Sequence, residues 1–494
     1  MNLAKILSKV KVKFEINCDD CDVKIEDIAI DSRLVKSAIS TVFFALDGEK
    51  TSGEKFISSA IKNGAKIIVT KNFLQQDGII FIKTQNPFQL LVEFLNEFYN
   101  QLPSNIYTVT GTNGKSSVVE FVRQILQFLG KKSATIGTLG ISCDKKIKDL
   151  VSFDLTTPDI VSLYKNLAIL KKNNIDDVAI EVSSIGLKQA RIAGLKIDVA
   201  AFTNFTQDHL DYHKTMEEYF FSKMLLFEAV MKNGSAAVLN ADIAEFANIR
   251  KMCEHKKHHI FEYGFKANDL KIIEIKKDGE KQKILLQCAA KNHEIELNFS
   301  GEFQVYNVLC ALAMVMSKHY LDEEKFSDLL KKFPKLTVAL GRMQKIATLT
   351  NNAQVFIDFA HSPDAFENVL KLASSFDNHR IGVLFGCGGN RDKTKRANMG
   401  KVASEFADFI IVTDDNPRNE DAAAIRKDIL QGCDMAKTVE IADRKYAIEK
   451  SLQMLQVNDI LILAGKGHEK YQIIGDVKNE FDEEKIVKEF LRNK

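Results

Sequence analysis

The segment 107–117, with the sequence YTVTGTNGKSS, constrains the fold of this chain more than any other. A run of strand-forming residues that ends at Thr110 is followed by two glycines, a lysine and hydroxyl residues, and then by apolar residues at helical spacing up to Leu129. A glycine-containing turn between a strand and a helix lets successive backbone N–H groups surround an anion. The segment therefore predicts a phosphate cradle within an α/β fold.

Single residues of this motif have separate expected roles. Lys115 can reach the terminal phosphates of ATP or GTP, and the hydroxyl of Ser116 can bind Mg²⁺. Val109 stands where the usual pattern has a glycine, so a plain turn between strand and helix is the structural alternative. The strand-to-helix setting favours nucleotide binding. The residues of the motif expected to bind the nucleotide are Gly111, Thr112, Asn113, Gly114, Lys115, Ser116 and Ser117.

The length and composition indicate a large globular protein. At roughly 150 residues per domain, 494 residues suggest about three domains. Lys and Arg number 68 against 66 Asp and Glu, and a net charge of +2 provides no field that would favour nucleic acid. No run of about eighteen apolar residues occurs, and the first residues lack the apolar run of a signal peptide. A cytoplasmic enzyme without a membrane or nucleic-acid partner is expected.

Pattern changes divide the chain into three expected domains, residues 1–102, 103–334 and 335–494. The first has strand patterns at 41–46 and 65–70 with a helical run between them. The second alternates helices with short apolar strands at 177–182, 199–203 and 236–240, which predicts a parallel sheet covered on both faces. The third has buried-type strands at 355–357, 381–385, 409–412 and 459–463.

Polar residues follow every strand of the third domain. The loops are 358–364 (DFAHSPD), 386–393 (GCGGNRDK), 414–418 (DDNPR) and 465–469 (GKGHE). Loops at the carboxyl ends of the strands line the ligand crevice of a doubly wound sheet. Any one of these loops is also typical of an ordinary turn, but together they predict a binding surface.

Two charged side chains occupy positions where burial would be costly, and a histidine lies between carboxylates. Glu181 ends an apolar strand, which favours a magnesium ligand over a carboxylate that caps the next turn. Lys223 lies in a nearly apolar helical run, where burial would lower its pKa and allow its amine to react with carbon dioxide to give a metal-binding carbamate. Extension of the lysine to solvent is the alternative. His209, beside Asp208 and Asp211, can bind a metal or belong to a surface loop.

Six motifs, in this order over nearly the whole chain, resemble the Mur ligases. They are TGTNGKS at 110–116, EVSS at 181–184, DHLDYH at 208–213, GRM at 341–343, DFAHSPD at 358–364 and AGKGHE at 464–469. The likeness is greatest to the members that add the third amino acid of the peptidoglycan precursor. It implies an α/β protein of three domains: a UDP-substrate-binding α/β domain, a central P-loop-type ATPase sheet, and a C-terminal Rossmann-like doubly wound sheet that receives the amino acid.

The resemblance also implies the reaction, in which ATP phosphorylates the D-glutamate side-chain carboxylate of a UDP-MurNAc-dipeptide and an amine attacks the acyl phosphate. Lys115, Glu181, His209 and carbamylated Lys223 would be catalytic. The implied Mg²⁺ ligands are Ser116, Glu181, His209 and Lys223. The further ATP contacts implied are Asn307, Arg342 and Asp358. The residues implied to bind the UDP substrate are Ser32, Thr156, Thr157, Ser183, Gln189 and Arg191.

The tetrapeptide Asp-Asn-Pro-Arg at 415–418 resembles the signature of members that add meso-diaminopimelate. This amino acid carries a carboxylate where the lysine chain ends, and the guanidinium of Arg418 can bind it through two parallel hydrogen bonds. Bound lysine would leave the guanidinium unpaired. The implied diaminopimelate pocket comprises Arg391, Asp415, Asn416, Pro417, Arg418, Gly465 and Glu469, with Glu469 opposite an ammonium.

Other functions stay open at this point, among them a lysine-adding Mur ligase. A folylpolyglutamate synthetase-like ligase would share the central and C-terminal architecture, but that class lacks the uridine-type first domain and the Asp-Asn-Pro-Arg signature. The other alternative is a non-catalytic nucleotide-binding regulator, against which the four catalytic candidates argue together. The chain departs from the family pattern at Ile185, Gln344 and Asn390, where histidine, glutamate and aspartate are usual. A monomer is expected.

Overall fold

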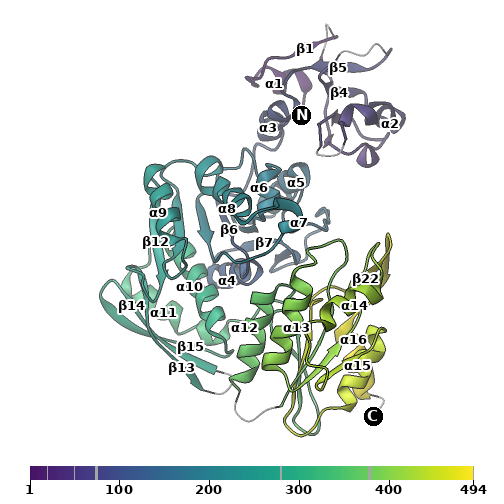
Figure 1. Cartoon of the computed structure of the whole chain (residues 1–494). Helices are drawn as coiled ribbons and strands as arrows, with labels where there is room; N and C mark the ends of the chain where they lie inside the picture. The colour runs from purple at the N-terminus through teal and green to yellow at the C-terminus, as the bar shows by residue number, and fades with distance from the viewer. Residues whose placement is uncertain (19–20, 49–50, 73–75, 279–280, 377–379, 493–494) are drawn as a thin grey trace. The chain divides into compact units, whose positions relative to one another are not determined.

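The computed structural model of the chain describes residues 1–18, 21–48, 51–72, 76–278, 281–376 and 380–492 (Figure 1). The chain forms two compact units. The first combines Met1–Asn105, Lys145–Asp176 and Gln189–Lys196, and the second combines Ile106–Asp144, Asp177–Lys188 and Ile197–Lys494. The α/β class is confirmed, because both units contain helices and largely parallel sheets. The expected boundaries after residues 102 and 334 stay predictions.

The first unit contains a five-stranded sheet in the order β1-β5-β4-β3-β2. Its strands are β1 (Glu15–Ile16), β2 (Asp27–Ala29), β3 (Thr41–Phe44), β4 (Ile67–Thr70) and β5 (Ile80–Lys83). Its helices are α1 (Leu3–Leu7), α2 (Ile57–Lys62), α3 (Pro87–Phe98) and α5 (Ile160–Lys172). Strands β2 to β5 pair in parallel, and β1 pairs antiparallel with β5. The expected strands at 41–46 and 65–70 are β3 and β4.

A ten-stranded sheet belongs to the second unit, in the order β15-β14-β13-β12-β11-β10-β6-β9-β7-β8. Its strands are β6 (Asn105–Thr110), β7 (Ser133–Gly137), β8 (Gly140–Cys143), β9 (Asp177–Glu181), β10 (Val199–Phe202), β11 (Ala236–Asn240), β12 (His259–Gly264), β13 (Leu270–Asp278), β14 (Lys281–Cys288) and β15 (Lys291–Leu297). The accompanying helices are α4 (Lys115–Phe128), α6 (Ser184–Lys188), α7 (Leu210–His213), α8 (Met216–Leu225), α9 (Phe246–His255), α10 (Glu302–Met316) and α11 (Glu323–Leu330).

The pairing within this sheet differs from the expected parallel arrangement at its margins. Strands β6, β10, β11, β12 and β13 pair in parallel in turn, as predicted. Strands β13 to β15 and the pair β7–β8 are antiparallel. Buried and exposed residues alternate along β14, as in an antiparallel strand that is covered on one face. The antiparallel extension therefore follows from a local pattern that the broad strand–helix alternation conceals.

Helix α4 begins directly after the turn that follows β6, and it packs with α10 on the sheet. Its apolar residues recur at helical spacing and are buried with Leu309 and Leu312 of α10 and with Tyr107 and Val109 of β6. Burial of apolar surface stabilises such contacts by roughly 25 cal/mol per Å². This packing fixes the first turn of α4 against the end of β6, where the cradle motif lies.

The second unit also contains a six-stranded sheet in the order β16-β17-β21-β18-β19-β20. Its strands are β16 (Gln344–Thr348), β17 (Gln354–Asp358), β18 (Ile381–Phe385), β19 (Phe409–Val412), β20 (Thr438–Glu440) and β21 (Ile460–Ala464). The surrounding helices are α12 (Pro363–Ser374), α13 (Lys395–Phe406), α14 (Ala422–Leu430), α15 (Arg444–Gln453) and α16 (Glu483–Arg492). The four strands expected here are β17, β18, β19 and β21, each within one residue of its predicted ends. An unexpected hairpin of β22 (Tyr471–Ile474) and β23 (Val477–Glu480) follows.

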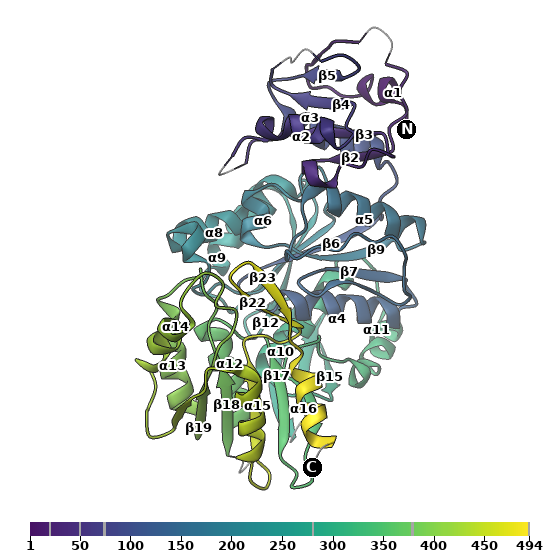
Figure 2. The same cartoon turned by 90° about the vertical axis from the view of Figure 1, so that its right-hand side faces the viewer.

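Helices cover both faces of the six-stranded sheet, which confirms the doubly wound arrangement (Figures 1 and 2). Ile410 and Val412 of β19 are buried with residues of α12, α13 and α14. The alternate residues Phe409 and Ile411 are buried with α15 and α16. Successive side chains of a strand point to opposite faces, so an apolar strand without alternation belongs between two helical layers.

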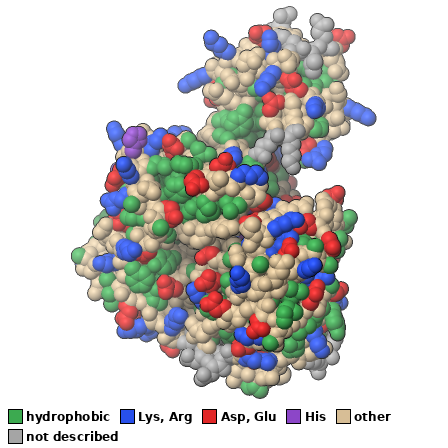
Figure 3. Space-filling model, in the orientation of Figure 1, with side chains coloured by type: hydrophobic (Ala, Val, Ile, Leu, Met, Phe, Trp, Pro, Cys, Tyr) green, Lys and Arg blue, Asp and Glu red, His purple; other side chains and the backbone are tan. Residues whose placement is uncertain are grey.

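The surface carries charges of both signs. Figure 3 shows basic and acidic side chains interspersed on the visible face, in keeping with the net charge of +2. Within the described ranges, none of the helices combines the length and the apolar character needed to cross a bilayer.

Candidate active site

The turn between β6 and α4 passes too close to its neighbours for side chains at two positions. Gly111 has φ +143°, and a Cβ there would lie 1.9 Å from Oγ1 of Thr203. Gly114 has φ +90°, and a Cβ there would lie 2.4 Å from Oδ1 of Asn307. The two glycines therefore allow the close backbone path that the cradle requires. The predicted ATP contact Asn307 lies directly against this turn.

Residues that follow β10 fasten the turn. The backbone N–H of Thr112 donates to the carbonyl of Asn204 (2.9 Å), and that of Asn113 donates to Oδ1 of Asn204 (2.8 Å). The hydroxyl of Thr203 donates to the carbonyl of Asn113 (2.7 Å). The side-chain amide of Asn113 donates to Asp364, at the start of α12, across 2.7 Å. The cradle is thus held by two loops that are distant from it in sequence.

Ser116, Glu181 and Arg342 meet beside the cradle. The Ser116 hydroxyl donates to Oε2 of Glu181 (3.0 Å), and Nη2 of Arg342 lies 3.0 Å from the same hydroxyl. The backbone N–H of Thr138 donates to Oε1 of Glu181 (2.9 Å). Burial raises the pKa of Glu181, whereas the charges of Lys115 and Arg342 lower it. A hydroxyl and a carboxylate offer the hard oxygen ligands that Mg²⁺ prefers.

Two lysines, the half-buried Lys115 and the buried Lys223, converge on the carbonyl of Gly111. Nζ of Lys115 donates to it across 2.9 Å and to the carbonyl of Thr112 across 2.8 Å, and Nζ of Lys223 donates to it across 2.7 Å. Lys223 also lies 4.4 Å from the ring centre of Tyr219. Burial lowers the pKa of both lysines, that of Lys223 strongly. Lys223 is 1% exposed, so it does not extend to solvent as the alternative expected.

His209 lies near these lysines, and both it and His361 face Asp208. Its Nε2 is 3.5 Å from Oδ2 of Asp208, and Nε2 of His361 is 3.9 Å from the same oxygen. Burial lowers the pKa of His209 to about 4, so the ring is neutral at pH 7. Lys395, at the start of α13, is buried, and its charge lowers the pKa of Asp208. Within the described ranges, no group of three or more His, Cys, Asp or Glu residues could hold a metal ion.

Asp358 and Gln344 shape the loop that carries Arg342. The two oxygens of Asp358 accept the backbone N–H groups of Met343 and Ala360, each across 2.6 Å. Oε1 of Gln344 accepts the backbone N–H of Gly341 (2.8 Å), so this departure from the family pattern keeps an acceptor. The role of Asp358 seen here is to hold backbone, and its contact with ATP stays a prediction.

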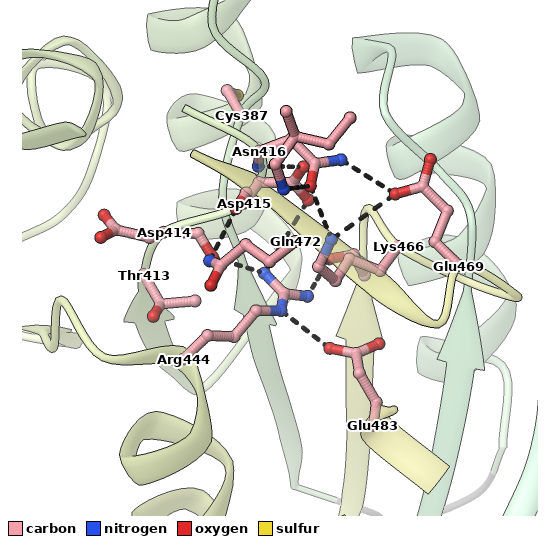
Figure 4. Close-up of polar contacts among 12 residues, drawn as sticks. Cys387, Thr413, Asp414, Asp415, Asn416, Arg444, Lys466, Glu469, Gln472 and Glu483 are labelled. Atoms are coloured by element: carbon pink, nitrogen blue, oxygen red, sulfur yellow. Dashed lines mark hydrogen bonds and ion pairs between the residues drawn. The ribbon is translucent and has the colours of Figure 1, made fainter. Parts of the chain in front are cut away.

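The loops after β19 and β21 meet at a buried polar cluster (Figure 4). The amide of Asn416 donates to Oε2 of Glu469 (2.9 Å), and Nζ of Lys466 donates to Oδ1 of Asn416 (3.0 Å). Gly465 has φ +104°, and a Cβ there would lie 2.9 Å from Oδ2 of Asp415. Four of the predicted pocket residues, Asp415, Asn416, Gly465 and Glu469, are therefore brought together.

Arg418 lies at the edge of this cluster. Its Nη1 donates to the carbonyl of Gly389 (2.9 Å), and in the described part of the chain no carboxylate forms an ion pair with it. Burial, and then the charge of Arg391, lower the pKa of Arg418. A Cβ on Gly389 would lie 1.9 Å from the carbonyl of Pro417, so the loop after β18 packs closely on the Asp-Asn-Pro-Arg loop. Arg391 is exposed, and Asn390 hydrogen-bonds through its backbone to Glu420.

A second arginine, Arg444, hydrogen-bonds to the backbone where both loops begin. Arg444 of α15 is 2% exposed; its Nη2 donates to the carbonyl of Ala464 (2.8 Å) and its Nη1 to the carbonyl of Asp414 (3.3 Å). Its Nε donates to Oε1 of Glu483 (2.8 Å) at the start of α16 (Figure 4). Arg444 thus ties the ends of two strands to α16.

The residues expected to bind the UDP substrate fall in both units. In the first unit, Arg191 donates to the carbonyl of Thr157 (2.8 Å) and to Oε1 of Gln189 (2.5 and 3.1 Å). Thr156 is adjacent in sequence. Ser32 is buried in the same unit, and the amide of Asn63 donates to its carbonyl (2.9 Å).

Ser183 lies in the second unit, where its hydroxyl accepts the backbone N–H of Gly186 at the start of α6 (3.0 Å). The neighbouring Ser184 hydroxyl lies 2.9 Å from Nε2 of His213. Ile185 is partly buried on α6. A histidine therefore reaches this stretch from α7, although the family histidine at 185 is absent.

Sequence reasoning missed the supporting residues. Lys466, His361 and Asp364 lay within the quoted motifs without an assigned role, and Arg444 lay outside them. A lysine between two glycines was a local signal for Lys466, whereas an acid after a proline is common at turns and helix starts and does not distinguish Asp364. Nothing local marks Arg444, whose partners are 20 to 39 residues away.

Comparison with known families matches three parts of the chain. Residues 24–98 match the model described as Mur ligase family, catalytic domain; residues 109–315 match the Mur ligase middle domain; and residues 341–467 match the Mur ligase, glutamate ligase domain. The second match begins in β6 and so contains the cradle. The third ends at Gly467 and so contains the loop after β19 and Lys466, but stops short of Glu469.

Named relatives and solved structures agree with these matches. UDP-N-acetylmuramoyl-L-alanyl-D-glutamate--2,6-diaminopimelate ligases of Rickettsia montanensis and Agrobacterium fabrum are 39% and 38% identical, over 95% of this chain and 96% and 94% of theirs. A solved structure of a ligase of that name is 29% identical, with a TM-score of 0.67, and covers 100% of this chain and 99% of its own.

A Mycobacterium tuberculosis folylpolyglutamate synthase, solved with ADP and AMPPCP, is 17% identical with a TM-score of 0.62, over 76% of this chain and 91% of its own. At that identity the likeness concerns the fold alone. The matches to the diaminopimelate ligases, by contrast, extend over nearly every residue of the chain, its first hundred included. On these grounds, this chain belongs to the Mur ligase family.

Proposed function

We propose that this protein joins meso-diaminopimelate to UDP-N-acetylmuramoyl-L-alanyl-D-glutamate, with conversion of ATP to ADP and phosphate, in the synthesis of the peptidoglycan precursor. The observation that carries the proposal is a phosphate cradle together with a buried polar cluster at whose edge Arg418 forms no ion pair with a carboxylate among the described residues. The names of relatives that align over nearly the whole chain support the same substrates.

The proposed reaction has two steps. A carboxylate oxygen of the D-glutamate side chain attacks the γ-phosphorus of ATP, and ADP leaves. The amine of the incoming amino acid then attacks the acyl carbon, phosphate leaves, and the amine loses a proton. The protein contributes mainly position and charge. Lys115, whose ammonium lies among the backbone carbonyls of the turn, is placed to hold the terminal phosphates.

The residues beside the cradle fit Mg²⁺. Ser116 and Glu181 supply two oxygen ligands, and Mg²⁺ ordinarily completes its shell with waters and phosphate oxygens. When bound, the ion would neutralise charge on the phosphates. A carbamate on Lys223 would add an anionic ligand near His209, and the low pKa of Lys223 favours the neutral amine that reacts with carbon dioxide. Asn307 and Arg342, beside the turn, are proposed to contact the nucleotide.

Amino-acid recognition is assigned to the polar pocket. The guanidinium of Arg418 would bind the distal carboxylate of meso-diaminopimelate, and Glu469 the distal ammonium. The backbone of Asp415, Asn416, Pro417 and Gly465 shapes the pocket, and Arg391 adds positive charge at its rim. On the other substrate, the proposed contacts are Ser32, Thr156, Thr157, Ser183, Gln189 and Arg191.

Phosphate release from ATP tests the proposal. The purified protein is given UDP-MurNAc-dipeptide together with meso-diaminopimelate, lysine, or neither, and a folate with glutamate serves as the competing pair. We expect release and a UDP-linked tripeptide with meso-diaminopimelate, and little with the others. Nucleotide binding without any amide product would favour the non-catalytic regulator and overturn the proposal. A cytoplasmic monomer is expected, which cell fractionation and light scattering would check.

A further inference from the structure

The loop after β21 directs one lysine inward. Gly465 and Gly467, on either side of Lys466, have φ +104° and +55°. A Cβ on Gly467 would lie 2.7 Å from Cβ of Phe359, so the loop also packs closely on the loop after β17. As a result, the Lys466 side chain is fully buried, at 0% exposed.

The ammonium of Lys466 uses all three of its N–H groups. It donates to Oδ1 of Asn416 (3.0 Å), to the carbonyl of Tyr471 (2.7 Å) and to Oε2 of Glu469 (3.5 Å). An ammonium has three donors, so this one has none left for a substrate. Lys466 therefore acts on the pocket through Asn416 and Glu469 (Figure 4).

The first consequence is the orientation of the Asn416 amide. Its oxygen accepts from Lys466 and from the backbone N–H of Ile473 (2.9 Å), so its NH₂ group is the one that faces Glu469. Without the lysine, the amide would lose one of the two donors that select this orientation. Glu469 would then lose a defined hydrogen bond and a defined position.

The second consequence concerns charge. Glu469 faces Asp415 and Arg418 from the loop after β19, Lys466 from its own loop, and the hydroxyl of Tyr471 from β22. Burial and then Asp415 raise the pKa of Glu469, whereas Lys466 and Asn416 lower it. Lys466 pairs with Glu469 (3.5 Å). Burial raises the pKa of Asp415, whereas the charge of Lys466 and then that of Arg444 lower it, so Lys466 favours the ionised form of both carboxylates.

We infer that Lys466 is a positioning residue for amino-acid recognition, which orients Asn416 and keeps Glu469 as a carboxylate aimed at the ammonium of the substrate. This inference rests on the proposed function. It assigns a role to a residue that does not itself touch the amino acid, and it accounts for the pair of left-handed glycines that bury the lysine.

The test compares Lys466→Met with Lys470→Met. Lys470 lies four positions later, with its side chain 70% exposed and paired with Asp482, so its variant controls for loss of a lysine from the same stretch. Steady-state kinetics are measured from pH 5 to 9 with meso-diaminopimelate, ATP or the UDP substrate varied in turn. For Lys466→Met we expect kcat/KM for meso-diaminopimelate at pH 7 to fall at least about 30-fold, with KM for ATP within about twofold of the wild type.

The pH profile separates positioning from general damage. Removal of the ammonium should shift the acid limb of kcat/KM for meso-diaminopimelate to higher pH by about one unit, because Glu469 then binds a proton more readily. Lys470→Met should leave the limb in place. An unmoved limb together with an unchanged KM for meso-diaminopimelate in Lys466→Met would overturn the inference.

If Lys466→Met does not fold, Lys466→Arg tests the inference instead. It keeps the charge but not the compact three-donor head, so the limb should stay in place while KM for meso-diaminopimelate rises roughly fivefold or more. An unchanged KM would overturn the inference. Failure of the proposed function looks different, because the wild-type protein would then form no amide with meso-diaminopimelate.

Discussion

The hydroxyl of Ser116 donates to a carboxylate oxygen of Glu181 across 3.0 Å, although the two residues are 65 positions apart in sequence. Arg342, a further 161 positions along, reaches the same hydroxyl. A residue at the start of α4, one at the end of β9 and one before β16 therefore meet at a single oxygen atom. This convergence places a buried acid, a hydroxyl and a cation next to a phosphate cradle.

Glu181→Gln is expected to lower phosphate release in the complete reaction by roughly 100-fold or more. The amide keeps the size of the side chain but removes the negative charge that would hold Mg²⁺. Phosphate release over a titration of Mg²⁺ measures the effect, and half-saturation should move to higher concentration. Glu254→Gln, at an exposed glutamate paired with Arg250, is the control. Activity within twofold of the wild type and an unaltered Mg²⁺ dependence would remove Glu181 from the site.

Lys223→Ala is expected to abolish product formation, with partial recovery in high concentrations of a short carboxylate such as acetate. The carboxylate would replace the anionic group that the carbamate supplies, whereas a lysine that only donates to Gly111 could not be replaced by an anion. Lys223→Arg should be inactive and not rescued, because a guanidinium forms no carbamate. Full activity of Lys223→Ala without a carboxylate would refute the assignment, and Lys232→Ala, at an exposed lysine, is the control.

Features built from residues that are adjacent in sequence were predictable. Contacts between residues that are distant in sequence were not. The cradle lies within eleven residues, and the six-stranded sheet follows from apolar runs of four or five residues between helices. By contrast, the fastening of the turn by Thr203 and Asn204, and the meeting of Arg342 with Ser116, join residues 90 to 226 positions apart. No local periodicity reports such contacts, because packing of the whole unit decides them.

The margins of the sheets were also difficult to predict, for a different reason. Strands β13 to β15 alternate polar and apolar residues, but they follow a long series of parallel strands and helices that suggested continuation of the same pattern. The helical run expected around Lys223 is α8, which ends at Leu225, and residues Leu226–Val230 continue it as a π-helix. Apolar content predicts burial more directly than it predicts where a helix changes type.

Arg418→Ala is expected to raise KM for meso-diaminopimelate about 30-fold or more, which corresponds to roughly 2 kcal/mol for a charge-assisted pair. Binding of ATP should change little, because Arg418 contacts the loops after β18 and β22 and not the cradle. The ratio of kcat/KM for meso-diaminopimelate over lysine is the decisive measurement. It should fall in Arg418→Ala and stay constant in Lys401→Ala, at an exposed position on α13. An unchanged ratio would remove the specificity argument.

Because its ring is buried, we expect His213 to lower the free energy of unfolding in mild acid. The ring is buried between the hydroxyls of Ser184 and Ser222, and burial lowers its pKa from 6.5 to about 4. Between these values the unfolded chain binds a proton that the folded chain does not, so stability falls as the pH falls from 6.5 towards 4. The loss attributable to His213 between pH 7 and 5 is about 2 kcal/mol. Urea unfolding at both pH values should show a smaller loss in His213→Gln and no such change in the exposed control His259→Gln.

Arg444→Met is expected to destabilise the part of the chain around the six-stranded sheet by about 3–5 kcal/mol, because it leaves Glu483 buried without its partner. Both side chains are almost fully buried, and the arginine also satisfies the carbonyls of Asp414 and Ala464. If the expected domain of residues 335–494 unfolds as one unit, this loss lowers the thermal midpoint by roughly 6–20 °C. Adding Glu483→Met to Arg444→Met should recover part of the loss, since the double variant no longer buries a lone charge. Arg492→Met, at the exposed end of α16, is the control. Equal midpoints for the single and double variants would mean that the carbonyl contacts, and not the ion pair, account for the effect of Arg444.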